Sequence, residues 1–174
     1  MFNKSQFFHE DKLLNQDKND IELFKKHAQE ICDELFSTKL SHLNIKDYSY
    51  NTSEAVAELG LDEELINQLI DDYVAQVLKA TVQFDDYMEV LQDSQDKKVK
   101  LDYTLFRELA HKNLGVARNL RIKDAEKLLY ELMKQEDLEY LLHCLEALKV
   151  CAIKLRPQYA YDTLKLIEVK NFLT

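Results

Sequence analysis

Apolar residues recur three or four positions apart through most of this chain, which is the spacing of amphipathic α-helices. The longest such series begins after Asp62, a good helix N-cap, and continues for about seven turns. Its apolar positions are Ile66, Leu69, Tyr73, Val77, Ala80, Phe84, Met88 and Leu91. The pattern predicts one long helix whose apolar side faces a core.

Two shorter helices are predicted before the long one. Asp20 is the expected N-cap of an amphipathic helix over 21–35. Ser53 is the expected N-cap of a short helix over 54–59, which ends at Gly60 because glycine readily adopts the left-handed conformation found at helix C-termini. The segments outside these helices, at the N-terminus and just before Ser53, show no helical period and are expected to be a loose arm and a connection.

Three more helices are predicted after the long one. Apolar spacing favours helices over about 102–120, 125–133 and 138–155. Pro157 ends the last of these, since proline cannot continue a helix interior. The tail that follows Pro157 mixes alternating and helical spacing, so its structure is left open.

The predicted helices indicate an all-α fold, an antiparallel four-helix bundle with an N-terminal helical extension. The bundle is expected over 53–156, with the arm and extension over 1–52 and the tail over 157–174. The extension is amphipathic and needs a partner surface. Covering one side of the bundle and joining two copies into a dimer both satisfy that need, and the sequence does not decide between them.

Composition narrows the class of protein. Only 2 glycines and 1 proline among 174 residues, with 46% hydrophobic residues, favour helices over sharp turns. The net charge of −9 argues against nucleic-acid binding, which needs clustered cations. The 3 cysteines suit a reducing cytosol, and neither a signal peptide nor a membrane-length apolar run is present. A cytoplasmic location is expected, with no membrane partner.

The predicted helix over 102–120 holds a glycine, Gly115, one turn after a histidine, His111. Glycine inside a helix costs roughly 0.5–1 kcal/mol relative to alanine, so its presence calls for a reason. At about 100° per residue, the core-facing stripe comprises Leu105, Phe106, Leu109, Ala110, Val116, Ala117 and Leu120. The opposite face carries Arg107, His111, Leu114, Gly115 and Arg118. An exposed imidazole beside bare backbone is accessible to another macromolecule.

Residues 110–120, AHKNLGVARNL, resemble the signature of histidine-containing phosphotransfer (HPt) domains. In that family an A-H-x-L-K-G-x-A-x-N-L segment lies on the second long helix of a four-helix bundle. The segment 59–92 is similar to the family's first long helix with the short helix before it, and 122–148 resembles the third and fourth helices. The likeness covers about 53–156.

The resemblance implies a phosphoryl carrier in a two-component phosphorelay. His111 would accept the phosphoryl group from a receiver-domain aspartate or a histidine kinase and pass it on, while Gly115 gives the partner room to approach. The residues expected at the docking surface are Arg107, Lys112, Leu114, Gly115 and Arg118. The partner's metal ion and lysine would stabilise the transferring group, so this chain is expected to need no cofactor, no metal and no kinase activity of its own.

Two positions depart from the family pattern. Asn113 replaces a leucine and falls in the predicted buried stripe, where an amide needs hydrogen-bond partners. Leu114 replaces the lysine that would sit beside the phosphoryl group, and Arg107 and Arg118 are the cations that could compensate. These departures motivate an alternative, a degenerate HPt-like module that docks onto partner proteins without phosphotransfer.

The remaining candidate residues have simpler interpretations. His143 with Glu139 and Cys144 suggests a weaker third hypothesis, a metal-binding helical bundle, but no second ligand pair of known spacing accompanies them. Packing residues are the favoured interpretation. The acidic pairs Asp71–Asp72 and Asp85–Asp86 are expected on solvated helix faces.

Overall fold

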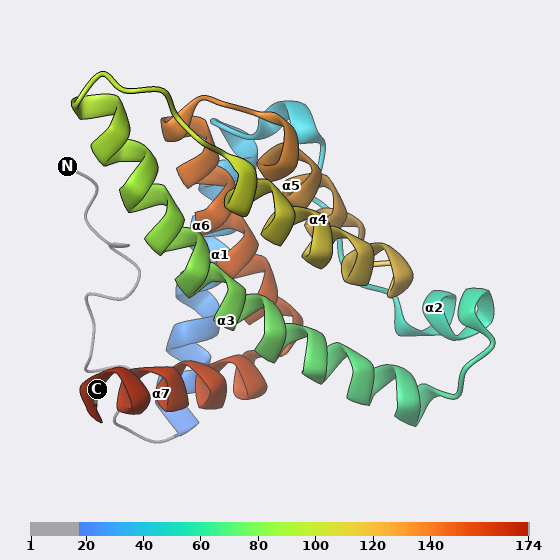
Figure 1. The fold of residues 1–174 in the computed structure, drawn as a ribbon. Helices are drawn as coiled ribbons and strands as arrows, with labels where there is room; N and C mark the ends of the chain where they lie inside the picture. The colour runs from blue at the N-terminus through green and yellow to red at the C-terminus, as the bar shows by residue number, and fades with distance from the viewer. Residues whose placement is uncertain (1–17, 174) are drawn as a thin grey trace.

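The computed structural model describes residues 18–173, and over this range the chain is all-α, with seven α-helices, one short 3-10 helix and no strand (Figure 1). The elements are α1 (Lys18–Ser37), η3 (Ser41–Leu43), α2 (Thr52–Leu59), α3 (Glu63–Asp96), α4 (Thr104–Asn119), α5 (Lys123–Lys134), α6 (Leu138–Leu155) and α7 (Pro157–Leu173). The loose arm was expected over 1–19. Its positions 1–17 lie outside the described residues, and positions 18 and 19 belong to α1 instead. The helices predicted from spacing are therefore confirmed.

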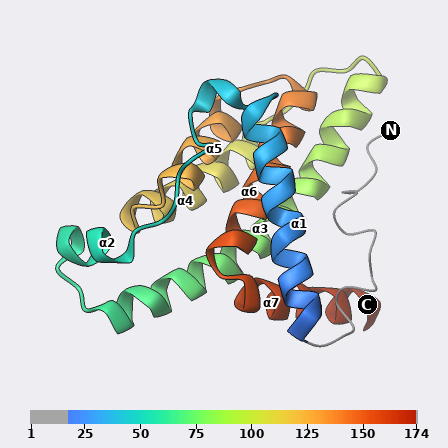
Figure 2. The same cartoon turned by 180° about the vertical axis from the view of Figure 1, so that it is seen from behind.

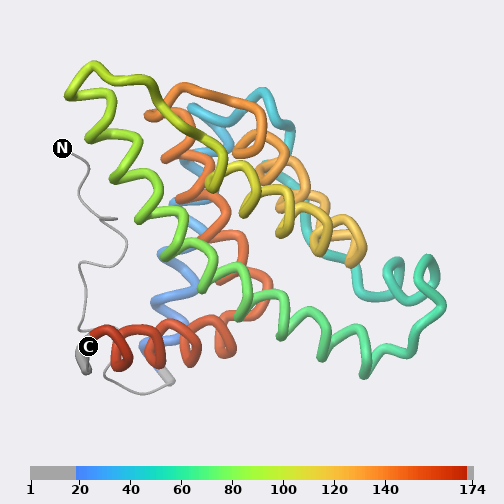
Figure 3. Tube along the Cα trace, in the orientation of Figure 1, coloured from blue at the N-terminus to red at the C-terminus, as the bar shows by residue number. Residues whose placement is uncertain are grey.

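Helix α6 is the central element of the fold. It contacts α1, α3, α5 and α7, and 11 of its 18 residues are buried. Helix α4 lies against α5 and α3 on the far side of the molecule from α1 (Figures 1 and 2). Helix α7 crosses α3 and also touches α1 and α6, as the Cα trace in Figure 3 makes plain. One continuous apolar core joins all the long helices.

The N-terminal extension covers one side of this core. Helix α1 packs along α6 and buries Phe24, Ala28, Cys32, Leu35 and Phe36. The Phe24 ring meets the Tyr161 ring of α7 edge to face, with centroids 5.8 Å apart. The apolar stripe of α1 is thus buried within the chain itself.

Helix boundaries follow local hydrogen-bonding chemistry. The Asp62 carboxylate accepts from the Leu65 amide at 2.8 Å, and Gly60 ends α2 in the left-handed conformation with φ of 66°, as predicted. The cap of α2 was wrongly predicted at Ser53. Asn51 is the cap, because its extended backbone lets the side-chain oxygen accept from the Glu54 amide at 3.0 Å.

Two other boundary expectations are corrected or completed by the structure. Asp20 lies in the first turn of α1 and is not its N-cap, because the helix begins at Lys18. Pro157 ends α6 and also starts α7, since the first helical position needs no amide hydrogen bond. The tail that lacked a clear period is therefore a helix, with Ala160, Tyr161 and Leu164 buried and Leu166 and Val169 exposed.

Two of the acidic residues predicted to be solvated instead pair with cations on α6 and at its end. Asp85 binds Lys149 at 2.9 Å, and Lys149 is only 7% exposed. Asp71 binds Arg156 at 3.1 Å, and Asn67 accepts from the same guanidinium at 2.7 Å. The sequence pattern did not predict these contacts, because residues of α3 outside its apolar seam also face neighbouring helices. Asp72 and Asp86 are exposed as predicted.

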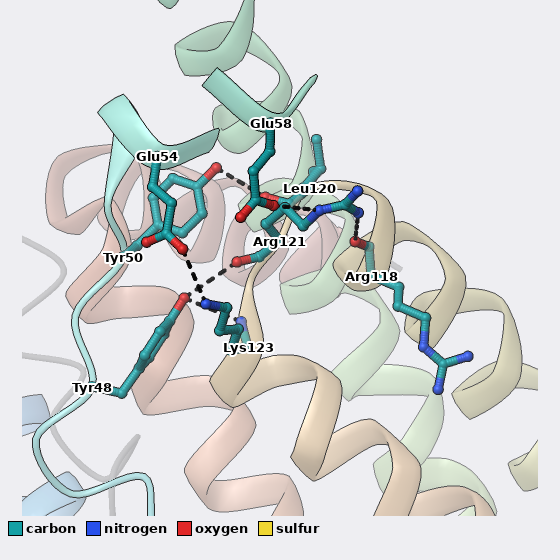
Figure 4. A network of polar contacts seen from close by, with 8 residues as sticks. All are labelled: Tyr48, Tyr50, Glu54, Glu58, Arg118, Leu120, Arg121 and Lys123. Carbon is teal, nitrogen blue, oxygen red and sulfur yellow. Dashed lines mark hydrogen bonds and ion pairs between the residues drawn. The ribbon is translucent and has the colours of Figure 1, made fainter. Parts of the chain in front are cut away.

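The connection before α2 is fastened to the turn between α4 and α5 (Figure 4). The Tyr48 hydroxyl donates to the Arg121 carbonyl at 3.3 Å and accepts from the Lys123 amide at 3.1 Å. The Tyr50 hydroxyl donates to the Leu120 carbonyl at 2.9 Å. We call these two side chains and the turn residues they bind the tyrosine clamp. It satisfies backbone groups that the helix ends leave without partners.

Ion pairs reinforce the tyrosine clamp. Arg121, whose φ of 61° makes the sharp turn, binds Glu58 at 2.8 Å, and Lys123 binds Glu54 at 3.2 Å. The Arg121 guanidinium also donates to the Arg118 carbonyl at 2.8 Å. Both carboxylates belong to α2, so that short helix is held against the C-terminal end of α4.

The tyrosine clamp predicts a loss of stability in alkali. Burial raises the pKa of Tyr48 to about 12, so its hydroxyl stabilises the fold fully below the ordinary value of 10.0 and less as the pH rises toward 12. In urea unfolding across that pH window, Tyr48→Phe should lose less stability than the wild type. At neutral pH the free energy of unfolding of Tyr48→Phe should be about 1 kcal/mol lower than that of the wild type. Tyr159→Phe, at an exposed position, is the control, and equal alkaline losses for Tyr48→Phe and the wild type would contradict the role of the clamp.

Candidate functional site

Helix α4 presents His111 to solvent. His111, Lys112, Gly115, Arg118 and Asn119 are all exposed, whereas the opposite side of the helix enters the core. The buried residues are Phe106, Ala110, Asn113, Leu114 and Ala117. The Phe106 ring meets the Phe84 ring of α3 edge to face at 5.0 Å between centroids, which fixes the rotation of α4 about its axis.

The buried side of α4 differs from the predicted stripe at two leucines. Leu114 was wrongly predicted on the exposed face, since it is 2% exposed, and Leu105 was wrongly predicted in the core, since it is 57% exposed. The reason is that α4 packs against both α5 and α3, so its buried side is wider and rotated relative to a stripe facing one neighbour. Leu114 therefore offers no surface to a docking partner.

Asn113 is buried as predicted, and the structure supplies its partners. It is 1% exposed, its amide donates to the Leu109 carbonyl at 2.9 Å, and its oxygen accepts from the Gln76 amide of α3 at 3.2 Å. These bonds offset the cost of burying a polar group. Gln76 was missed by sequence reasoning because it lies one position off the apolar seam of α3, where nothing distinguishes it from a solvated glutamine.

Gly115 leaves a bare patch beside the imidazole. Within residues 18–173, and beyond the neighbouring backbone of α4 itself, a Cβ placed on Gly115 would meet no atom within 4 Å, and the residue has no positive φ. Neither the packing of the described residues nor the backbone conformation requires a glycine here. At Gly60, by contrast, the positive φ of 66° explains the glycine directly.

The two arginines predicted near His111 are both engaged in ion pairs. Arg107 binds Glu136 at 2.8 Å and lies 4.9 Å from the centre of the Tyr103 ring. Arg118 binds Glu126 of α5 at 2.9 Å. Both pairs are partly exposed, so they hold the side chains only weakly. The positive charge of the arginines is therefore partly balanced at the flanks of the site.

Lys112 borders a groove of mixed polar and apolar lining between α3, α4 and α7. Among the described residues it makes no ion pair, in contrast to Arg107 and Arg118. The groove is lined by Asp72, Ala75, Gln76, Lys79, Ala80, Gln83, Leu109, Lys112, Asn113 and Tyr159. It adjoins the exposed face of α4, so a partner docked over His111 would also reach these amide and ammonium groups.

The other candidate residues do not join this site. His143 and Glu139 lie on α6, with 3.9 Å between the imidazole nitrogen and the carboxylate oxygen, and Cys144 is buried. Within residues 18–173, no three His, Cys, Asp or Glu side chains are arranged to hold a metal ion. None of the described helices combines the length and apolar character needed to cross a bilayer.

No protein-family model matches this chain, and neither a curated protein nor a solved structure shows significant similarity to it. The interpretation of the site therefore rests on its residues and their geometry.

The corrected face of α4 predicts opposite outcomes for its two leucines. Leu114→Ala should lower the free energy of unfolding by about 2–5 kcal/mol, because it empties a filled core position. Leu105→Ala, on the same helix, should change it by less than about 0.5 kcal/mol. Urea denaturation followed by circular dichroism measures both. Equal effects would mean that α4 is rotated from the orientation described.

The two glycines should likewise respond in opposite directions. Gly115→Ala should raise the free energy of unfolding by about 0.5–1 kcal/mol, since the added Cβ meets open space and alanine favours the helix. Gly60→Ala should lower it, because its positive φ strains any residue with a Cβ. Thermal unfolding of both variants is the measurement. Destabilisation by Gly115→Ala would indicate a structural need for that glycine.

Proposed function

We propose that this protein is a histidine phosphotransfer protein, which carries a phosphoryl group on His111 to or from a response-regulator receiver domain. The observation that carries the proposal is the exposed imidazole beside a glycine that the fold itself does not need. A destabilising residue kept at the surface is explained if a partner must approach the helix backbone there. The resemblance of residues 110–120 to the HPt signature supports the same role.

The arrangement of helices agrees with this proposal. A long helix, the histidine helix and two further helices follow one another as α3, α4, α5 and α6, which is the order of the HPt four-helix bundle. The short helix α2 precedes them, also as in that family. We accordingly interpret α3–α6 as the bundle, with α1 and α7 as additions packed onto it.

The proposed reaction needs only a nucleophile from this chain. A neutral imidazole nitrogen of His111 would attack the phosphorus of the receiver's aspartyl phosphate, forming an N–P bond as the P–O bond to the carboxylate breaks. The receiver's own metal ion and lysine would stabilise the transferring group. The reverse transfer regenerates the free imidazole and the aspartyl phosphate.

Cations on α4 would take the place of the missing lysine. Lys112 is exposed next to His111 and makes no ion pair among the described residues. Arg107 lies one turn before the histidine and Arg118 two turns after it, each in a partly exposed pair with a glutamate. Such surface pairs break at little cost, so either guanidinium is available to an incoming phosphoryl group or acidic partner.

A docking module without phosphotransfer is the second candidate. The observation in its favour is that the family's lysine position holds Leu114, whose side chain is buried and cannot reach a phosphoryl group. In this case the same exposed face would bind a receiver-like partner, and His111 would serve only as a contact.

The proposal predicts a phosphorylated His111. Incubation with receiver domains phosphorylated by a radiolabelled acyl phosphate should transfer an acid-labile, base-stable label to the wild type. His111→Gln should abolish the label without loss of helical content. His42→Gln, which alters another exposed histidine, should keep it.

Binding measurements separate the two candidates. Gly115→Gln should weaken both labelling and receiver binding, because its side chain would fill the bare patch. Suppose that a receiver binds the wild type, binds Gly115→Gln more weakly, and exchanges no label with either protein. That result would favour the docking module. Label that persists in His111→Gln would refute the assignment of the phospho-acceptor.

A further inference from the structure

A pocket of about 360 Å³ borders the connection that leads into α2. Its walls come from this connection, from α1, from the first turn of α5 and from the last turn of α6. Tyr48 and Tyr50 belong to the wall, and the tyrosine clamp holds their hydroxyls against the turn between α4 and α5 (Figure 4). Ligand pockets in proteins measure about 300–1,000 Å³, so this one suits a small molecule.

Four charged side chains that line the pocket make no ion pair with any other described residue. Lys46 and Asp47 belong to the connection. Asp124 lies in the first turn of α5 and Lys154 in the last turn of α6, and both are half-buried. The dipole of its own helix favours each of these two, because carboxylates suit helix N-termini and ammonium groups suit C-termini. Neither needs the other as a partner, so both are available to a ligand.

The remaining charge in the pocket wall is already balanced. The Arg156 guanidinium binds Asp71 at 3.1 Å and donates to the Asn67 side-chain oxygen at 2.7 Å. The uncommitted charges are therefore two ammonium groups and two carboxylates, which sum to zero. An anion in the pocket would face two carboxylates, and a cation would face two ammonium groups. A small molecule that carries one positive and one negative group matches both signs.

We propose that this pocket binds a free amino acid in its zwitterionic form. The carboxylate of the ligand faces Lys46 and Lys154, and its ammonium group faces Asp47 and Asp124. The inference is independent of the proposed phosphotransfer function, because it uses no residue of the exposed face of α4.

A ligand of this kind offsets the cost of burying charge in the pocket wall. Burial raises the pKa of the Asp124 carboxyl, because its charged form loses contact with water. An ammonium group beside Asp124 stabilises that charged form. The carboxylate of the ligand does the same for the half-buried ammonium group of Lys154. Each end of the ligand thus meets a charged group that is partly removed from water.

Isothermal titration calorimetry of the full chain tests the proposal. The common free amino acids are titrated one at a time at neutral pH, and at least one should bind. Two comparators of that amino acid are then titrated, the amine that lacks its carboxylate and the carboxylic acid that lacks its amino group. Each comparator should bind at least about tenfold more weakly, because each loses one of the two charged contacts.

Variants at the two half-buried charges locate the ligand. Lys154→Met and Asp124→Asn should each weaken binding about tenfold or more. Asp124→Asn keeps a side-chain oxygen for the Ala125 amide, which Asp124 binds at 2.7 Å, so the start of α5 is retained. Lys165→Met and Asp72→Asn make the same changes at exposed positions outside this pocket and should bind as the wild type does. Melting temperatures check that the variants are folded.

Three results would overturn the proposal. The first is that no amino acid binds the wild type at millimolar concentrations. The second is that either comparator, or inorganic phosphate, binds as tightly as the amino acid. The third is that folded Lys154→Met and Asp124→Asn both bind as the wild type does. The first two are obtained with the wild type alone, so a variant that fails to fold does not obscure the answer.

Discussion

The burial of α6 on several sides is the constraint on which the rest of the fold depends. Because α6 touches α1, α3, α5 and α7, each of these helices must turn an apolar side toward one shared axis. Lys149 lies within this buried surface and is accommodated by Asp85 of α3. A paired buried charge adds little net stability, but an unpaired one is costly, so the pair favours one alignment of α3 with α6.

Local chemistry predicted much of the architecture. The seam of the long helix, the Asp62 cap, the Gly60 terminus and the stop at Pro157 depend on neighbours in sequence, and all appear in the structure. What depends on distant packing was harder to predict. Helix α7 was not predicted, because apolar residues lie on both of its sides and obscure the helical period. The outward orientation of Leu105 and the burial of Leu114 could not be predicted without knowing that α4 has two neighbours.

The candidate site shows the same division between local and distant information. The exposure of His111 and Gly115 follows from helical spacing alone, whereas the Gln76 partner of Asn113 and the glutamates paired with Arg107 and Arg118 come from other segments. The amide pair has a structural consequence for the site. The hydrogen bond from Gln76 satisfies the buried Asn113 side chain directly behind the exposed face of α4. A polar residue can therefore lie on the buried side of α4 without displacing His111.

The tyrosine clamp has a mechanical consequence for the exposed face of α4. Helix ends normally fray, because their last carbonyl groups lack partners within the helix. Here Tyr50 binds the Leu120 carbonyl immediately after the end of α4, and the Glu58–Arg121 pair anchors the next residue to α2. A molecule that binds the surface around Gly115 therefore meets a helix end that is held in place by residues 63 and 70 positions away in the chain.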